Sequence, residues 1–86
     1  MKRYKHYTDA RHGWVGVKRQ ELIDLGIIND ISPYSYQNGS MVYLEEDVDA
    51  RRFIVMFEYK NGIKPLIVDG SYQDSHYIRR YERFSK

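Results

Sequence analysis

The stretch of residues 41–62 most constrains what this chain can fold into, because it holds the densest apolar run and the densest acidic run of the sequence. Residues 41–44 are predicted to form a strand, and an acidic turn at residues 45–49 follows at once. Asp47 is placed to cap a helix, since its carboxylate can accept hydrogen bonds from the exposed amides of a first turn. Asp49 suits the positive end of that helix. The stretch therefore predicts a strand, a capped turn and a helix in succession.

An apolar stripe supports the helix after the acidic turn. Apolar side chains recur at positions i, i+3, i+4 and i+7, as one face of a helix requires: Ala50, Phe53, Ile54 and Phe57. Asn61 and Gly62 are suited to closing this helix. The alternative is a hairpin, because residues 53–59 are rich in β-forming side chains and residues 59–63 can form its turn. The cap and the stripe favour the helix.

The remaining elements are shorter. We expect a strand at 14–17, a helix at 18–25 closed by Gly26, a hairpin of strands 34–36 and 41–44, and a strand at 63–69. Asn38 and Gly39 predict the hairpin turn, because both accept a positive φ angle. Proline cannot donate a ladder hydrogen bond, so Pro33 predicts a strand that starts late or lies at an edge, and Pro65 predicts an edge or an early bulge. The β-α-β-β-α-β order predicts an α+β fold with a small antiparallel sheet and helices on one face, and a ferredoxin-like sheet is one such arrangement.

The chain has 86 residues, which is enough for one small domain. Residues 1–12 are polar, basic and without a period, so we expect a basic N-terminal arm there. Residues 13–86 are expected to form the single α+β domain, which ends in a basic and aromatic tail of unassigned structure. The sequence contains no Cys, which excludes disulfides, thiolate metal sites and a Cys nucleophile.

The net charge of +2 conceals a division along the sequence. Residues 1–19 have a net charge of +5, residues 20–76 have −6 and residues 77–86 have +3. Basic ends therefore flank an acidic middle, and the sign of the electrostatic potential depends on which face a partner meets. The N-terminus lacks the apolar run of a signal peptide, and no stretch is long enough to span a bilayer. We therefore expect a soluble, cytoplasmic protein without a membrane partner.

No arrangement of residues in the sequence predicts catalysis or a cofactor. His6, His12 and His76 are far apart and lack metal-ligand spacing. The serines lie outside any nucleophile-elbow pattern, and no glycine loop is suited to holding a phosphate. We therefore expect a protein that is not an enzyme and that holds no cofactor and no metal. The alternative is a divalent-cation site in the acidic turn, with oxygen ligands from Glu45, Glu46, Asp47 and Asp49.

Tyrosine and arginine mark the first of two candidate binding surfaces. Both residue types are over-represented among the hot spots of protein interfaces. The predicted partner-binding residues are Tyr34, Tyr36, Tyr43, Arg79, Arg80, Tyr81 and Arg83. The alternative for the tyrosines is packing at the edge of the core.

The basic ends of the chain form the second candidate surface. Cations interleaved with aromatic rings suit single-stranded nucleic acid, whose phosphates pair with Lys and Arg while its bases stack on the rings. The residues predicted for this alternative are Lys2, Arg3, Tyr4, Lys5, Arg11, Arg79, Arg80 and Arg83. The acidic middle argues against it, because the nucleic acid would have to stay on the ends.

Several stretches resemble a set of small proteins found in phages and bacterial mobile elements. The resemblance rests on His12–Val15, Leu25–Ile27, Ile31–Tyr36 and Val42–Asp47, with Gly62–Pro65 and Ile78–Tyr81 in agreement, and it covers most of residues 12–84. It implies no catalytic residues. It implies a setting in which a compact protein binds a host macromolecule, including a host defence complex.

The sequence therefore leads to two function hypotheses. The first is a small, non-enzymatic, phage-encoded protein that binds a host protein or defence complex in the host cytoplasm and occludes its surface. The second is a single-stranded nucleic-acid-binding module that uses the basic and aromatic ends. The oligomeric state is left open by the sequence.

Overall fold

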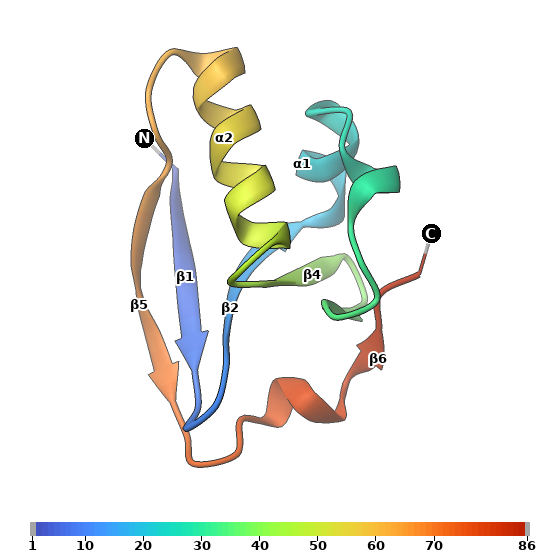
Figure 1. Cartoon of the computed structure of the whole chain (residues 1–86), viewed down its shortest axis with the longest axis vertical. Helices are drawn as coiled ribbons and strands as arrows, with labels where there is room; N and C mark the ends of the chain where they lie inside the picture. Colours follow the sequence, from blue (N-terminus) through green and yellow to red (C-terminus); the bar gives the residue numbers. More distant parts are fainter. Residues whose placement is uncertain (1, 86) are drawn as a thin grey trace.

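A computed structural model describes residues 2–85, which form one α+β unit (Figure 1). Its strands are β1 (Arg3–Thr8), β2 (Gly13–Lys18), β3 (Tyr36–Asn38), β4 (Met41–Glu45), β5 (Leu66–Tyr72) and β6 (Glu82–Arg83). Its α-helices are α1 (Arg19–Asp24) and α2 (Asp49–Asn61), and its 3-10 helices are η1 (Ile28–Asp30) and η2 (Tyr77–Arg80). The predicted α+β class is confirmed.

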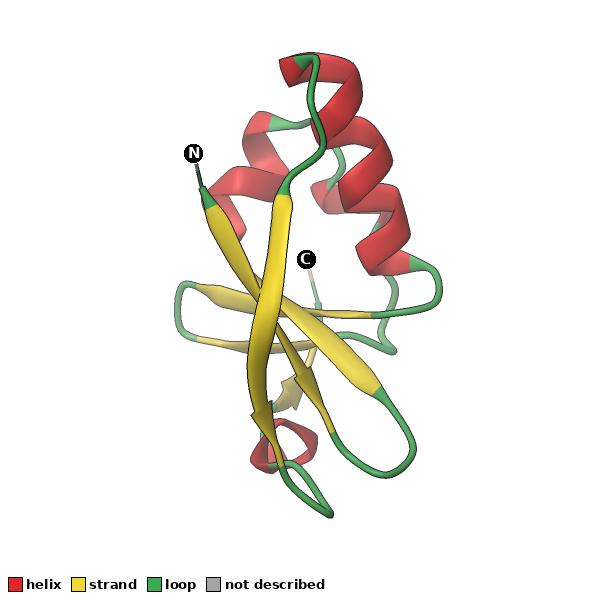
Figure 2. Cartoon of the chain, turned by 90° about the vertical axis from the view of Figure 1, so that its left-hand side faces the viewer, coloured by secondary structure: helices red, strands yellow, loops and turns green. Residues whose placement is uncertain are grey.

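The six strands form one sheet in the order β5-β1-β2-β4-β3-β6. The predicted sheet was antiparallel, but the sheet is mixed, because β1 pairs with β5 in parallel. The predicted β-α-β-β-α-β order describes β2 to β5 and omits β1 and β6. A ferredoxin-like sheet does not form, since β1 inserts between β5 and β2. The sheet is strongly twisted, and Figure 2 shows the β3–β4 hairpin running nearly across β1 and β5.

The N-terminal arm was predicted wrongly, because residues 3–8 form the inner strand β1 rather than an arm. The strand alternates, so that Tyr4 points to the helices while Arg3 and Lys5 point to the other face. Tyr4 is buried and makes an edge-on contact with Phe53, at 5.1 Å between ring centroids. The burial of Tyr4 stabilises this strand despite the charged residues that alternate with it. Residue 1 of the predicted arm and residue 86 of the predicted tail lie outside the described residues.

Helix α2 confirms the helical prediction and excludes the hairpin alternative. Gly62 ends the helix with φ 79°, and its amide donates to the carbonyl of Glu58. The predicted cap is wrong, since Asp47 makes no capping hydrogen bond and Val48 holds the N-cap position. Instead, the Glu45 carboxylate accepts hydrogen bonds from the backbone amides of Asp47 and Val48.

The predicted hairpin forms, but its first strand begins two residues later than expected. Tyr36–Asn38 pairs with Met41–Glu45, with Tyr36 opposite Tyr43, and Tyr34 lies outside the strand. Of the two expected turn residues, only Gly39 has a positive φ angle, 59°. The predicted short helix is α1, and Gly26 follows it with φ 75° as expected. Strand β5 begins only after the buried Pro65 and extends through Tyr72, beyond the predicted end of the strand at residue 69.

Both α-helices lie on one face of the sheet, as predicted. The core on this face joins Leu22 of α1 and Phe53 of α2 to alternate residues of the inner strands. Those strand residues are Tyr4, Val15, Val17, Val42 and Leu44. Phe84 joins this core from the C-terminal end, where its amide donates to the carbonyl of Ser35. None of the helices in residues 2–85 is long and apolar enough to cross a membrane.

Candidate functional site

The face of the sheet opposite the α-helices holds a second, aromatic cluster. The C-terminal segment of residues 76–81 lies against this face, with His76 and Ile78 fully buried. The rings that contact one another here are Tyr7, Trp14, Tyr36, Tyr43, His76, Tyr77 and Tyr81. Trp14 is 2% exposed and lies outside the helix-side core. The sheet is therefore packed on both faces at this end.

Two glycines make room for one ring of this cluster. A Cβ atom on Gly70 would lie 2.9 Å from Cδ1 of Tyr7, and one on Gly16 would lie 3.2 Å from Cε2 of Tyr7. The Tyr7 ring therefore covers glycine on both neighbouring strands. Burial raises the pKa of the nearby Tyr43 phenol to about 12, and the phenols of Tyr81 and Tyr7 act in the same direction.

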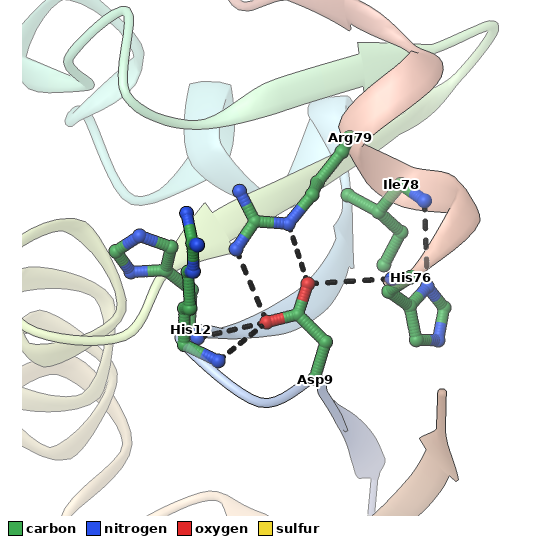
Figure 3. Close-up of polar contacts among 6 residues, drawn as sticks. Asp9, His12, His76, Ile78 and Arg79 are labelled. Carbon is green, nitrogen blue, oxygen red and sulfur yellow. Dashed lines mark hydrogen bonds and ion pairs between the residues drawn. The ribbon is translucent and has the colours of Figure 1, made fainter. Parts of the chain in front are cut away.

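A buried carboxylate, Asp9, fastens the C-terminal segment to the turn between β1 and β2 (Figure 3). It accepts hydrogen bonds from the amides of Arg11 and His12, both at 2.9 Å, and from the amide of His76 at 3.3 Å. Arg79 donates to both carboxylate oxygens through Nε and Nη2. The hydrogen bonds from Arg79, opposed by burial and helped by the three amides, hold the pKa of Asp9 well below its usual range.

The His76 ring is a structural part of this junction. Its Nδ1 accepts a hydrogen bond from the amide of Ile78, so the proton of the neutral ring lies on Nε2. That nitrogen lies 2.8 Å from Oγ of Ser71 and therefore donates to it. Burial lowers the pKa of His76, against the attraction of Asp9, so the ring is neutral near pH 7. In this tautomer His76 cannot accept the Ser71 proton, and the pair is not a nucleophile with its base.

A groove of about 270 Å³ lies beside this junction. Its aromatic side chains are Trp14, Tyr34 and Tyr36, and its charged or titratable ones are His12, Glu45, Asp47, Arg79 and Arg83. The guanidinium of Arg79 lies over the Trp14 ring at 5.4 Å, and that of Arg83 lies over the Tyr36 ring at 5.5 Å. Alternating cations and rings therefore build one wall of the groove, which we call the aromatic–arginine groove.

Hydrogen bonds to the buried Asp49 anchor the loop that carries Tyr34. The buried carboxylate of Asp49 accepts hydrogen bonds from the hydroxyls of Ser32 and Ser35, at 2.7 and 2.6 Å. The Ser35 hydroxyl in turn accepts from the amide of Glu45 in β4. Tyr34 itself is 68% exposed, so this anchored loop presents a large ring to solvent.

The structure brings together four of the seven residues predicted to bind a partner. Tyr34, Tyr36, Arg79 and Arg83 line the groove. Tyr43 and Tyr81 lie in the neighbouring aromatic cluster, and Arg80 is exposed beside a different hollow near the β3–β4 turn. The contributions of Trp14, Glu45 and Asp9 were not predicted from the sequence. Trp14 and Glu45 lie in two stretches that carry the resemblance, His12–Val15 and Val42–Asp47, whereas Asp9 lies in none of them.

The residues predicted for nucleic acid are divided by the fold. Tyr4 is buried with its hydroxyl donating to Glu21 at 2.5 Å, so its ring cannot stack on a base. Lys2 pairs with the same Glu21, and Arg79 pairs with Asp9. The remaining cations are exposed, and within residues 2–85 none of them has an ion-pair partner: Arg3, Lys5, Arg11, Arg80 and Arg83.

The acidic turn does not gather its carboxylates at one point. Asp49 is buried below the Tyr34 loop, while Glu45 accepts from backbone amides and Glu46 contacts His6 at 3.1 Å. Across residues 2–85, no three His, Asp or Glu side chains are close enough to hold a metal ion. Glu45, Glu46 and Asp49 therefore have separate roles in the fold.

A larger hollow, of about 700 Å³, lies away from the groove, between α1, α2 and residues 63–65. Phe53 and Phe57 form part of its lining. Lys2 and Tyr4 are the only predicted site residues in it, and both are engaged with Glu21. The aromatic–arginine groove is therefore the better candidate site despite its smaller volume.

No family model, curated protein or solved structure matches the chain.

Proposed function

We propose that this chain is a non-enzymatic binding protein that contacts another protein through the aromatic–arginine groove. The observation that carries the proposal is the exposed Tyr34 ring, which lines the same groove as Arg83 and lies on a loop whose Ser32 and Ser35 side chains donate to the buried Asp49. A rigid aromatic side chain loses little conformational entropy on binding. Tyr and Arg are the residue types that most often dominate interface energetics.

The charges of the groove favour a protein over a nucleic acid as its occupant. Glu45 and Asp47 line the groove together with Arg83. Carboxylates repel phosphates, whereas a protein surface can offer a cation to each carboxylate and a carboxylate to the arginine. A partner with mixed charges around an apolar centre fits this lining.

A phage setting supplies the class of partner. The stretches that carry the resemblance to phage and mobile-element proteins include His12–Val15, Ile31–Tyr36, Val42–Asp47 and Ile78–Tyr81, and residues of all four line the groove. We therefore propose a host protein or host defence complex, in the host cytoplasm, whose surface this chain occludes.

A second candidate, single-stranded nucleic acid, is supported by the open part of the sheet. Arg3 and Lys5 project from the face opposite the helices, in line with Tyr7 of the same strand. Phosphates would pair with the two cations while a base stacks on the face of an aromatic ring of the cluster.

Affinity capture separates the two candidates. The tagged protein is incubated with bacterial lysate, once with and once without nuclease, and the bound species are identified by mass spectrometry. A stoichiometric protein that survives nuclease and moderate salt supports the groove proposal. Recovery of nucleic acid from the untreated sample alone, reduced when Arg3 and Lys5 are both changed to Ala, supports the second candidate, because phosphate binding weakens steeply with salt and with lost cations.

A further inference from the structure

The outer side of α2 carries an unpartnered stripe that the proposed function does not use. Residues 48, 52, 55 and 59 follow one another at spacings of four, three and four, which places them on one face of a helix. Val48 is 53% exposed, Val55 62% and Tyr59 83%. Figures 1 and 2 show no other element on this side of the helix. The stripe lies opposite the buried face that contains Ala50 and Phe53.

We propose that the stripe is a self-association surface, on which α2 of a second copy of this chain packs in antiparallel orientation. Two observations identify the second copy as the occupant: the charges beside the stripe and the shape of the surface. The proposal is independent of the aromatic–arginine groove.

The charges beside the stripe match only when two copies run antiparallel. Arg51 and Glu58 lie on the same flank, two turns apart, and both are exposed. Within residues 2–85 neither has an ion-pair partner. A two-fold axis perpendicular to the helices reverses the direction of the second helix. Each flank of one helix then faces the same flank of the other. Arg51 of each copy then meets Glu58 of the other, so the complementary pair forms twice.

A parallel arrangement would lose this match. It would bring the flank of Arg51 and Glu58 against the other flank of the second helix, where Met56 is the partly exposed side chain and Asp49 is buried. No exposed carboxylate of α2 would then face Arg51. The charge pattern therefore selects the antiparallel orientation.

The shape of the surface agrees with the same arrangement. A hollow of about 430 Å³ lies among Val48, Arg52 and Val55 at the N-terminal half of the helix. Tyr59 projects from the C-terminal half, which an antiparallel second copy places opposite that hollow. Each copy thus offers a ring to the hollow of the other. The methylene stem of Arg52 covers apolar surface while its charged head stays at the edge.

The expected dimer is weak, because α2 is only about 20 Å long at about 1.5 Å per residue and a surface of that length lies at the small end of stable interfaces. Sedimentation velocity from about 10 μM to about 1 mM covers the range in which such an interface equilibrates. The wild-type protein is expected to shift from monomer to dimer across this range. A monomer at every concentration would overturn the proposal and leave the stripe to a helix of another protein.

Variants test the orientation. Tyr59→Ala is expected to weaken association more than tenfold, since it removes an aromatic anchor from both halves of the interface. Arg51→Glu and Glu58→Arg should each weaken it about tenfold, because each sets like charges opposite one another twice. The double variant carrying both reversals should restore wild-type association. All of these residues are exposed, and circular dichroism verifies that each variant folds.

Failure of the double variant to recover association would overturn the antiparallel register. A dimer indifferent to Tyr59→Ala would overturn the use of the stripe itself. Tyr34→Ala, a change in the aromatic–arginine groove, is expected to leave the dimer unchanged. A loss of dimer in that variant would place the contact at the groove and contradict the inference, while leaving the proposed function standing.

Discussion

Replacing Asp9 with Asn should release the C-terminal segment from the sheet. The Asn side chain keeps one carbonyl oxygen for the amides of Arg11 and His12. Its NH2 group would face two other donors, the Arg79 guanidinium and the His76 amide. The substitution therefore removes the charge-assisted contact between Arg79 and both carboxylate oxygens. It also places the new NH2 group against the N–H donors of Arg79 and His76.

The expected loss of unfolding free energy is about 3 kcal/mol. Breaking a buried ion pair by removing one partner costs about 3–5 kcal/mol. The Asp9 side chain is 1% exposed, but that of Arg79 is 29% exposed and can regain water, which places the cost at the lower end. A loss of this size lowers the melting temperature of a domain of this length by more than about 10 °C.

The single tryptophan provides the assay. Trp14 is buried below Arg79 and next to His76, so its fluorescence reports whether the segment is docked, while far-UV circular dichroism reports unfolding. Glu46→Gln is the matched control. It breaks the exposed pair with His6, whose loss should cost about 0–1 kcal/mol. An Asp9→Asn protein as stable as this control would refute the reasoning.

The pH dependence tests the same contact independently. Because the pKa of Asp9 is lowered in the folded state, its contribution is complete above the unfolded pKa of about 4 and is lost as the pH falls further. The wild-type protein should lose about 1.4 kcal/mol per pH unit from this group below about pH 4. The difference between wild type and Asp9→Asn should therefore shrink towards pH 2, and a constant difference would contradict the account.

Two further predictions follow from the aromatic cluster. Gly70→Ala should lower the unfolding free energy by about 1–3 kcal/mol through overpacking, because the new Cβ atom would lie 2.9 Å from the Tyr7 ring and 3.1 Å from the His6 carbonyl. Asp69→Ala, at an exposed position of the same strand, is the control, and an equal loss of unfolding free energy in urea for the two variants would disprove the contact. Tyr43 should stay protonated up to about pH 12. Since the pKa of Tyr43 is raised in the folded state, its stabilising contribution is present below about pH 10 and is lost as the pH rises further. Tyr43→Phe should therefore reduce the loss of unfolding free energy at alkaline pH, as measured by circular dichroism. An unchanged loss of stability above about pH 10 would count against the burial of this phenol.

Local patterns in the sequence predicted the elements that depend on local chemistry. The stripe of Ala50, Phe53 and Phe57 predicted α2, and Gly26 and Gly62 marked the ends of both helices. The cap was predicted wrongly, since the carboxylate of Glu45, and not that of Asp47, accepts hydrogen bonds from the amides before the helix. Asp49 lies in the first turn as predicted, but its buried carboxylate accepts from the Ser32 and Ser35 hydroxyls, which are distant in sequence.

Strand β1 was missed because its residues are charged on one face and its pairing is not local. Tyr4, His6 and Thr8 alternate with Arg3, Lys5 and Tyr7, a period-two signal that the high charge concealed. The parallel partner of β1 is β5, more than half the chain away, and no local pattern encodes that pairing. The basic composition alone suggested an arm.

The candidate site could be predicted only as a set of residue types. Tyrosine and arginine pointed to residues that now line the groove, but the sequence could not separate Tyr34, which is exposed, from Tyr43, which packs in the cluster. The pair of Asp9 and Arg79 spans nearly the whole chain, so sequence spacing gave no sign of it.

The affinity of the captured protein partner for groove variants tests the central claim most directly. Isothermal titration of that partner against wild type, Tyr34→Ala and Tyr72→Ala compares two tyrosines of similar exposure, 68% and 60%, of which only Tyr34 lines the groove. The account predicts that Tyr34→Ala weakens binding about 30-fold or more, as expected for a hot spot, and that Tyr72→Ala changes it less than about twofold. Equal affinity of the two variants for the partner would contradict the groove as the binding surface.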